Sequence, residues 1–184
     1  MRILAISGSL RSGSYSTALL RALAEEAPDG VELELWDGLR DVPPYDADED
    51  VEQAHAAVAR LRDAVRAADA VLIATPEYNG SIPGALKNAL DWASRPFATN
   101  AFRNKPVGVV AASTGAFGGV WAQTELRKVL GIMGARVADI EVSVAHAHEK
   151  IDDDGIVIDA AVRESLRDAL STLAETAQPQ LAAA

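Results

Sequence analysis

The fold of this chain can be inferred from one segment, Gly8-Ser9-Leu10-Arg11-Ser12-Gly13-Ser14-Tyr15-Ser16-Thr17. It follows the apolar run Ile3-Leu4-Ala5-Ile6, which is typical of a buried strand, and it opens a helical pattern over 15–27. A strand, a loop of glycine and hydroxyl residues and then a helix form a socket for an anion, because loop N–H groups and the helix N-terminus point at one spot. Hydroxyl groups and the guanidinium of Arg11 complete the hydrogen bonds to that anion.

The spacing within this loop indicates which kind of phosphate it binds. Gly8 and Gly13 have the four-residue gap of a nucleoside-triphosphate loop, but Ser14 stands where that loop has its lysine. The clamp on the β- and γ-phosphates is therefore missing, and the chain has no G-x-G-x-x-G fingerprint either. We expect a site for a terminal monophosphate. A kinase-like phosphotransferase is an alternative that the missing lysine disfavours.

Composition narrows the class of protein. The 184 residues suit one domain, and the formal net charge is −10, from 17 basic and 27 acidic residues. Such an acidic field disfavours nucleic acid and anionic membranes as partners. The absence of cysteine excludes disulfides, thiolate catalysis and thiolate-bound metals. We recognise no signal peptide and no apolar stretch long enough to span a membrane, so we expect a cytoplasmic protein without a membrane partner.

Strand-like runs alternate with helical patterns along the chain, which is typical of an α/β fold with a five-stranded parallel sheet. Strands are expected at 2–7, 31–36, 70–75, 106–112 and 137–144, and helices at 15–27, 52–68, 83–94, 119–133 and 159–176. We expect residues 1–177 to form a single domain and residues 178–184 to form a flexible tail.

The residue pattern within each strand predicts its place in the sheet. The first, third and fourth strands are apolar throughout, as expected where helices cover both faces. The second and fifth alternate apolar and polar residues, which places them at the edges. The expected strand order is therefore 2-1-3-4-5, with the chain reversing direction between strands one and three. The loops 8–14 and 76–83 bound the crevice at that reversal.

Two further loops follow strands of this sheet. The third strand leads into Thr75-Pro76-Glu77-Tyr78-Asn79-Gly80-Ser81-Ile82-Pro83-Gly84, which two prolines stiffen. Asn79 and Gly80 tolerate the positive φ that turns backbone N–H groups outward, which suits the edge of a flat heterocycle, and Tyr78 adds a stacking face. The fourth strand leads into Ala112-Ser113-Thr114-Gly115-Ala116-Phe117-Gly118-Gly119, whose glycines let the backbone approach a ligand. A tight turn and a plain glycine-rich connection are the structural alternatives.

A phosphate socket on one side and a surface for a planar ring on the other describe flavin mononucleotide (FMN). At these residues the chain resembles the NAD(P)H-dependent FMN reductase family of flavodoxin-like proteins, which includes quinone, azo-dye and chromate reductases. The matching pieces run in family order over about residues 1–135. They are Gly8-Ser9-Leu10-Arg11 with Ser14, Thr75-Pro76-Glu77-Tyr78-Asn79, Pro83-Gly84-Ala85-Leu86-Lys87-Asn88-Ala89-Leu90-Asp91-Trp92, and Ser113 with Gly115, Gly118 and Gly119.

This resemblance implies a flavodoxin-like three-layer sandwich that binds FMN, with NADPH or NADH as electron donor. The electron acceptor would be a small molecule: a flavin, quinone, chromate, azo or nitro compound. The residues that would hold the FMN phosphate are Ser9, Arg11, Ser14, Ser16 and Thr17. Those that would line the isoalloxazine are Pro76, Glu77, Tyr78, Asn79 and Gly80, with Ser113 and Gly115 near the ribityl or pyrimidine side. Family members often carry asparagine where Ser16 stands.

The resemblance also implies a homodimer or homotetramer. In the family, the helix that here carries Lys87, Asp91 and Trp92 contributes to the subunit interface, and we expect Trp121 to do likewise. The alternative role of that helix is packing and surface charge.

No Ser-His-Asp or paired-carboxylate arrangement stands out, so we expect no catalytic side chain and a reaction carried by the cofactor. A flavodoxin-like electron carrier without NAD(P)H activity is the alternative, which Arg11 and an aromatic content of 5% disfavour. His146 and His148 with Glu149 make metal ligation conceivable, but no third ligand is evident and we expect no metal. Asp152-Asp153-Asp154-Gly155 lacks the spacing of a calcium loop and predicts a turn.

Overall fold

A parallel sheet with the strand order β2-β1-β3-β4-β5 lies at the centre of the protein, as the strand patterns predict. The structure is a computed structural model and describes residues 1–51 and 55–178. Its strands are β1 (Arg2–Ser7), β2 (Glu32–Trp36), β3 (Ala70–Thr75), β4 (Pro106–Ala112), β5 (Arg136–Val137) and β6 (Val142–Val144). The apolar strands β3 and β4 are buried along their whole length, whereas β2 at one edge is largely exposed.

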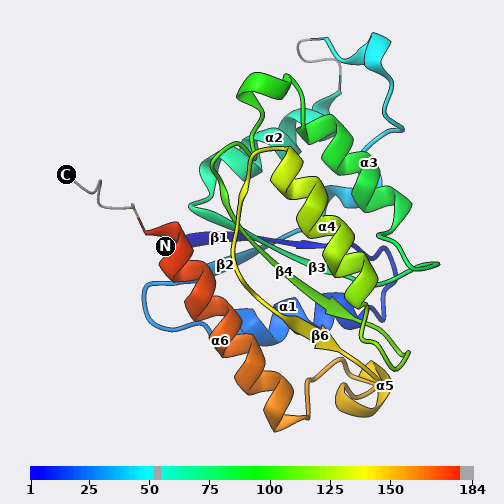
Figure 1. Cartoon of the computed structure of the whole chain (residues 1–184), viewed down its shortest axis with the longest axis vertical. Coiled ribbons are helices and arrows are strands. Elements are labelled where there is room, and N and C mark those ends of the chain that lie inside the picture. Colours follow the sequence, from blue (N-terminus) through cyan, green and yellow to red (C-terminus); the bar gives the residue numbers. More distant parts are fainter. Residues whose placement is uncertain (52–54, 179–184) are drawn as a thin grey trace.

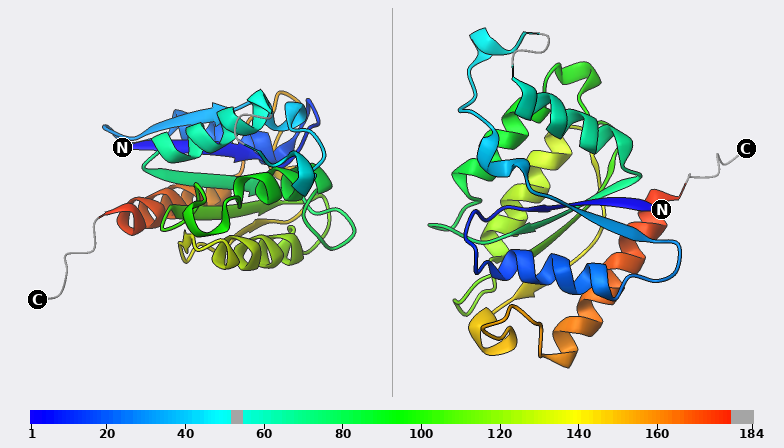
Figure 2. Two further views of the ribbon diagram at one scale, coloured as in Figure 1. Left: turned by 90° about the horizontal axis from the view of Figure 1, so that it is seen from above. Right: turned by 180° about the vertical axis from the view of Figure 1, so that it is seen from behind.

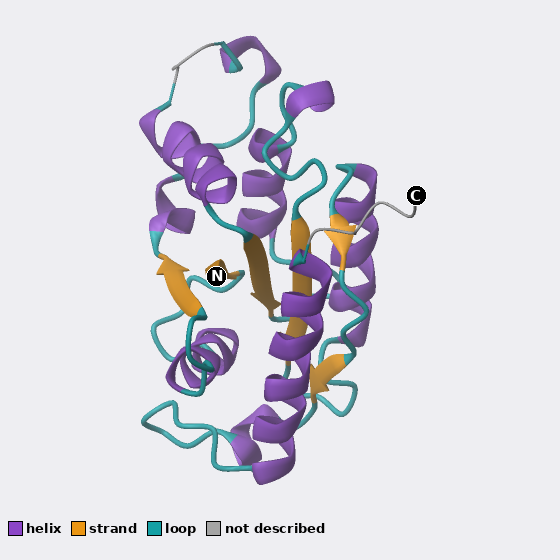
Figure 3. Ribbon diagram, turned by 90° about the vertical axis from the view of Figure 1, so that its left-hand side faces the viewer, coloured by secondary structure: helices purple, strands orange, loops and turns teal. Residues whose placement is uncertain are grey.

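Helices cover both faces of this sheet, so the protein has three layers (Figures 1 and 3). The helices are α1 (Tyr15–Glu25), α2 (Ala56–Ala67), α3 (Gly84–Ala93), α4 (Val120–Ile132), α5 (Ala147–Lys150) and α6 (Ala160–Ala177). Alternate strand residues face opposite layers. Ile3 and Ala5 pack with α1 and α6, whereas Leu4 and Ile6 pack in the core that α2, α3 and α4 cover.

The expected fifth strand at 137–144 is corrected by the structure, because it is divided into β5 and β6 and the sheet has six strands. Both short strands pair with β4, but the register advances by two residues between the pairs Val107–Val137 and Val110–Val142. The buried side chain of Gln123 from α4 enters at this break and donates from Nε2 to the Val109 carbonyl at 3.0 Å. The Gln123 side chain thus donates to the Val109 carbonyl in place of the backbone N–H that a continuous fifth strand would supply.

The other differences from the predicted elements lie at their ends and in short connections. The helix expected over 15–27 ends at Glu25, and the helix expected over 52–68 begins at Ala56, with residues 52–54 outside the described part. The short helix α5 and the 3-10 turns η1 (Gly38–Asp41), η2 (Ala47–Glu49) and η3 (Phe97–Thr99) were not predicted. The expected tail at 178–184 lies outside the described residues apart from Gln178.

Trp92 belongs to the interior. It is 1% exposed, and its indole Nε1 donates to the Pro43 carbonyl at 2.8 Å. Asn88, one turn earlier on α3, donates to the same carbonyl and accepts from the N–H of Tyr45, so these two side chains hold the segment before η2 against α3. Of the two roles considered for Trp92, the structure supports packing. None of the described helices is both long and apolar enough to cross a membrane.

Candidate functional site

The carboxyl ends of β1, β3 and β4 meet at one edge of the sheet, away from the side where β1 begins and α6 ends (Figure 2). A hollow at this edge lies at the crevice predicted from the chain reversal between β1 and β3. Its lining comes from the three loops and from the start of α1. The lining residues are Ser9, Arg11, Ser14, Tyr15, Ser16, Pro76, Glu77, Tyr78, Ala112, Ser113 and Thr114.

The first turn of α1 provides hydrogen-bond donors to the hollow. Ser14 is the N-cap, with extended backbone and a side-chain Oγ that accepts from the N–H of Thr17 at 3.3 Å. The N–H groups of Tyr15 and Ser16 have no acceptor within the helix, since the first four N–H groups of any helix lack one. This turn therefore presents free donors and the positive end of the helix dipole.

Ser16 carries the clearest sign of a missing partner. Its side chain is 1% exposed, and its Oγ is buried without a hydrogen-bond partner in the described part of the chain. Leaving a buried hydroxyl unpaired costs about 1–3 kcal/mol, so an acceptor bound beside Ser16 would offset that cost.

Arg11 supplies the positive charge at the hollow. Its side chain is exposed, and Nη2 makes only a long bond of 3.4 Å to the Gly13 carbonyl. No ion pair among the described residues engages it. The guanidinium is thus available for a bidentate contact with an oxyanion.

Two contacts that sequence reasoning missed hold the first loop in place. Arg40 donates from Nη2 to the Leu10 carbonyl at 2.8 Å, across 30 positions of the chain. Thr17 does not line the hollow; its Oγ1 donates to the Ser7 hydroxyl at 2.8 Å, and the same hydroxyl accepts from the N–H of Ser9 at 3.3 Å. Thr17 therefore braces the loop from behind.

The loop after β3 forms a tight turn that projects from the molecule (Figure 1). Tyr78 and Ser81 exchange backbone hydrogen bonds of 3.0 and 3.1 Å, and Asn79 and Gly80 between them have φ of 54° and 72°. Both central residues have the positive φ that the sequence predicted, and this geometry is a type I′ turn. Pro76, Glu77 and Tyr78 line the hollow, whereas Asn79 and Gly80 at the tip do not.

Glu77 has a second role that the sequence did not reveal. Its Oε2 accepts from the N–H groups of Trp121 and Ala122, at 3.0 and 3.1 Å, in the first turn of α4. The N-cap of α4 is Gly119, which has no side chain to cap the helix, so Glu77 caps it from another loop. Ser81 adds a bond of 2.6 Å from Oγ to Glu125 of the same helix. The loop after β3 is therefore fastened to α4.

The loop after β4 completes the hollow with Ala112, Ser113 and Thr114. Ser113 Oγ accepts from the N–H of Gly115 at 3.1 Å, so this hydroxyl shapes its own loop. Gly115 lies outside the lining, and its carbonyl accepts from the N–H of His146 at 3.2 Å. Tyr15, Ala112 and Thr114 are lining residues that sequence reasoning missed, because no motif distinguishes them from their neighbours.

The remaining candidates lie outside this hollow. The rings of His146 and His148 are 6.2 Å apart, and His148 lies 3.6 Å from the Glu149 carboxylate. Within the described residues, no group of three or more potential ligands gathers for a metal. Asp152 Oδ1 accepts from the N–H groups of Asp154 and Ile156, so the predicted turn is confirmed.

The donor set fits a phosphate monoester. Within the described residues, a buried hydroxyl without a hydrogen-bond partner, N–H groups without a helical acceptor and a guanidinium without a carboxylate partner line one hollow, whose second half is a stiff loop carrying Tyr78. A parallel sheet in this order, with helices on both faces, defines a flavodoxin-like protein.

The model of the NADPH-dependent FMN reductase family matches residues 1–149, and the chain belongs to this family of oxidoreductases. An NAD(P)H-dependent FMN reductase of Pseudomonas aeruginosa is 41% identical over 174 residues, which cover 94% of this chain and 93% of that protein. A quinone reductase of Escherichia coli is 36% identical over 181 residues, or 97% of this chain and 96% of that one. Among solved structures, the flavoenzyme NAD(P)H:(acceptor) oxidoreductase FerB of Paracoccus denitrificans superposes with a TM-score of 0.83, at 32% identity, over 95% of this chain and 98% of its own.

Proposed function

We propose that the hollow binds FMN and that the protein passes two electrons from NADPH or NADH through it to a small acceptor such as a quinone. When bound, FMN would supply the two-electron redox chemistry between the nicotinamide and the acceptor. The observation that carries this proposal is the buried Ser16 hydroxyl at the start of α1, which has no hydrogen-bond partner among the described residues and lines the same hollow as Arg11, an arginine with no carboxylate partner among them.

In this proposal the phosphate lies at the first turn of α1. Ser9, Ser14 and Ser16 offer hydroxyls, the helix start offers N–H groups, and Arg11 offers its guanidinium. Thr17 acts through Ser7, whose hydroxyl it fixes. A local cation matters here because the chain as a whole carries a formal charge of −10, which repels anions.

The isoalloxazine would lie between the loop after β3 and the loop after β4. Pro76 and Tyr78 offer flat apolar surface, and Glu77 holds its loop in place through α4. Asn79 and Gly80 at the turn tip, with Ser113 and Gly115 on the other side, would contact the polar edge of the ring or the ribityl chain. No side chain is assigned as a catalytic acid or base.

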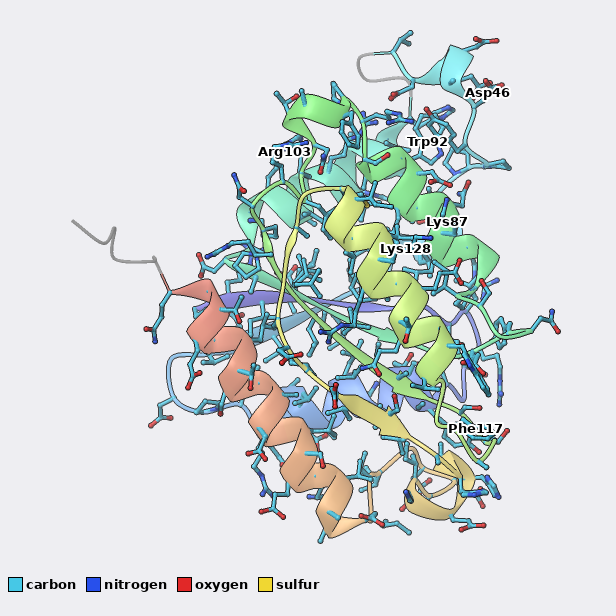
Figure 4. The ribbon with its side chains drawn as sticks, in the orientation of Figure 1. Asp46, Lys87, Trp92, Arg103, Phe117 and Lys128 are labelled. Carbon is cyan, nitrogen blue, oxygen red and sulfur yellow. The ribbon has the colours of Figure 1, made fainter. Side chains whose placement is uncertain are left out.

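We also propose that the protein is a homodimer or homotetramer whose contacts surround the hollow. Apolar side chains of the three loops and of the first turn of α4 are exposed: Leu10, Tyr78, Phe117, Val120 and Trp121. The rings of Phe117 and Trp121 contact each other with centroids 4.9 Å apart, and Phe117 lies at the outer end of its loop (Figure 4). An exposed apolar cluster of this kind favours association.

A visible spectrum tests the function directly. Purified protein is mixed with FMN, desalted, and then treated anaerobically with NADPH and, separately, with NADH. We expect retained flavin bands that bleach with at least one nicotinamide. Bands that persist with both donors would support the electron carrier instead, and protein that retains no flavin and shows no activity with added FMN would reject the proposed ligand.

A further inference from the structure

Gln123 is one of the few polar side chains buried in the described part of the chain, with 6% of its surface exposed. Its Nε2 donates to the Val109 carbonyl at 3.0 Å and lies 3.3 and 3.4 Å from the carbonyls of Val142 and Ile140. Its Oε1 accepts from the Ser143 hydroxyl at 2.7 Å. The amide therefore joins β4, the interruption of the edge strand and β6.

The interruption depends on this amide. Between β5 and β6 the chain leaves the ladder, and the N–H of Ile140 donates to the Ala138 carbonyl instead of to β4. The Val109 carbonyl is buried inside the sheet and would have no backbone donor there. Gln123 supplies that donor, which removes the cost of an unpaired buried carbonyl.

The residues that follow the interruption support the third loop of the site. We call 143–147 the support segment. The Val144 carbonyl accepts from the N–H of Ser113 at 3.0 Å. The N–H of His146 donates to the Gly115 carbonyl, and the N–H of Ala147 donates to the Ser113 carbonyl.

The support segment also touches the loop directly. A Cβ at Gly118, whose φ is 62°, would lie 2.6 Å from the carbonyl of Ser143. Only glycine fits so close a contact with this backbone conformation. The position of the loop after β4 relative to the sheet therefore depends on the position of Ser143. The Ser143 hydroxyl is in turn hydrogen-bonded to Gln123.

We propose that Gln123 is a positioning residue for the cofactor site. It holds the support segment in the position in which the loop after β4 places Ser113 and Thr114 in the lining of the hollow. The predicted effect of Gln123 on flavin affinity rests on the proposed FMN function. Its predicted effect on the loop after β4 does not, because it can be measured in the protein without FMN.

The test compares Gln123→Met with Asn100→Leu. Methionine keeps the length and volume of glutamine but donates no hydrogen bond. Asn100 is a matched control, because its side chain is also buried (4% exposed) and its amide donates to the carbonyls of Phe97 and Met133. It lies in the segment before β4, at the amino end of that strand, which is remote from the hollow. Three quantities are measured for each variant: the Tm, the Kd for FMN from quenching of flavin fluorescence, and hydrogen exchange of the Ser113, His146 and Ala147 amides without FMN.

We expect Gln123→Met to raise the Kd for FMN about tenfold and to speed exchange of the three amides. Both variants should lower the Tm, because each removes hydrogen bonds of a buried amide. Asn100→Leu, however, should leave the Kd for FMN within about twofold of wild type. Wild-type Kd and wild-type exchange in Gln123→Met would overturn the inference. An equal loss of FMN affinity in both variants would also overturn it, because the effect would then follow stability alone.

Ser143→Ala keeps the test decisive if Gln123→Met does not fold. This variant removes only the hydroxyl that bonds Gln123, so faster exchange of His146 and Ala147 supports the inference and unchanged exchange rejects it. If wild-type protein itself does not bind FMN, the proposed cofactor is wrong, whereas the exchange comparison still decides the role of Gln123.

Discussion

The hydroxyl of Ser16 is buried at the first turn of α1, where no described residue accepts or donates a hydrogen bond to it. Arg11, at the mouth of the same hollow, has an exposed guanidinium with no carboxylate partner in the described part of the chain. One oxyanion would give the Ser16 hydroxyl a hydrogen-bond acceptor and the Arg11 guanidinium a negatively charged partner, which neither group has among the described residues.

Ser16→Ala should therefore have opposite effects on stability and on binding. Removing an unpaired buried hydroxyl should raise the free energy of unfolding of the FMN-free protein by about 1 kcal/mol. Losing a hydrogen bond to a charged phosphate should weaken FMN binding by about 1.5–3 kcal/mol, or roughly 10- to 150-fold. Urea denaturation and an FMN titration measure the two quantities. Ser12→Ala is the control, since Ser12 is exposed and outside the lining; a destabilised Ser16→Ala protein with unchanged Kd would contradict the assignment.

Arg11→Ala should lose FMN without losing its fold. The side chain is exposed and packs against no core, so the Tm should stay within a few degrees of wild type, whereas the FMN Kd should rise at least tenfold. Arg21→Ala removes an equal charge from an exposed position of α1 and should bind FMN like wild type. Near-normal flavin content in desalted Arg11→Ala protein would rule out this phosphate site.

At the scale of elements, α4 connects two loops of the site. Its N-terminus is capped by Glu77 from the loop after β3, and Glu125 accepts from Ser81 of the same loop. Gln123 ties its first turns to the edge of the sheet and to Ser143. A movement of this helix would therefore shift both surfaces between which we place the flavin ring.

Glu77→Ala tests this connection. It removes the acceptor for two N–H groups and a negative charge at a helix N-terminus, which together should cost about 1–2 kcal/mol of unfolding free energy. Glu77→Gln keeps one acceptor oxygen and should cost about half as much. Urea denaturation of both variants, with exposed Glu141→Ala as control, measures the difference. Equal stability of all three variants would show that Glu77 does not cap α4 in solution.

At the scale of the whole molecule, the exposed apolar residues around the hollow suit association with further copies of the chain. Phe117 and Trp121 are 64% and 51% exposed, which is high for aromatic side chains in contact with each other. The interior tryptophan Trp92 has no such surface to offer.

Trp121→Lys should lower the molar mass of the protein in solution by breaking this contact, because a buried lysine without a partner is costly. Size-exclusion chromatography with light scattering gives the mass. Ile132→Lys places the same charge on an exposed apolar residue at the far end of α4 and serves as control. A wild-type protein that is already monomeric, or a Trp121→Lys protein of unchanged mass, would contradict the proposed assembly surface.

Local residue patterns were enough to predict the α/β class, the strand order and the position of the crevice. Whether a strand alternates or is apolar throughout depends on how many of its faces are covered, and that is visible locally. The positive φ at Asn79 and Gly80 is equally local, since it depends on the residue and its immediate neighbours.

The contacts between distant segments could not be predicted from local patterns and were found in the folded protein. The break between β5 and β6 inserts two residues relative to β4. Because side chains alternate between the two faces of a strand, an insertion of two residues leaves the alternation of buried residues from Ala138 to Val144 unchanged. The residue pattern of 137–144 therefore gave no sign of the break. The bonds from Arg40 to Leu10 and from Trp121 to Glu77 join positions 30 and 44 residues apart. Such pairings depend on how the chain packs, which no local pattern records, and the unpaired hydroxyl of Ser16 became visible only once its surroundings were known.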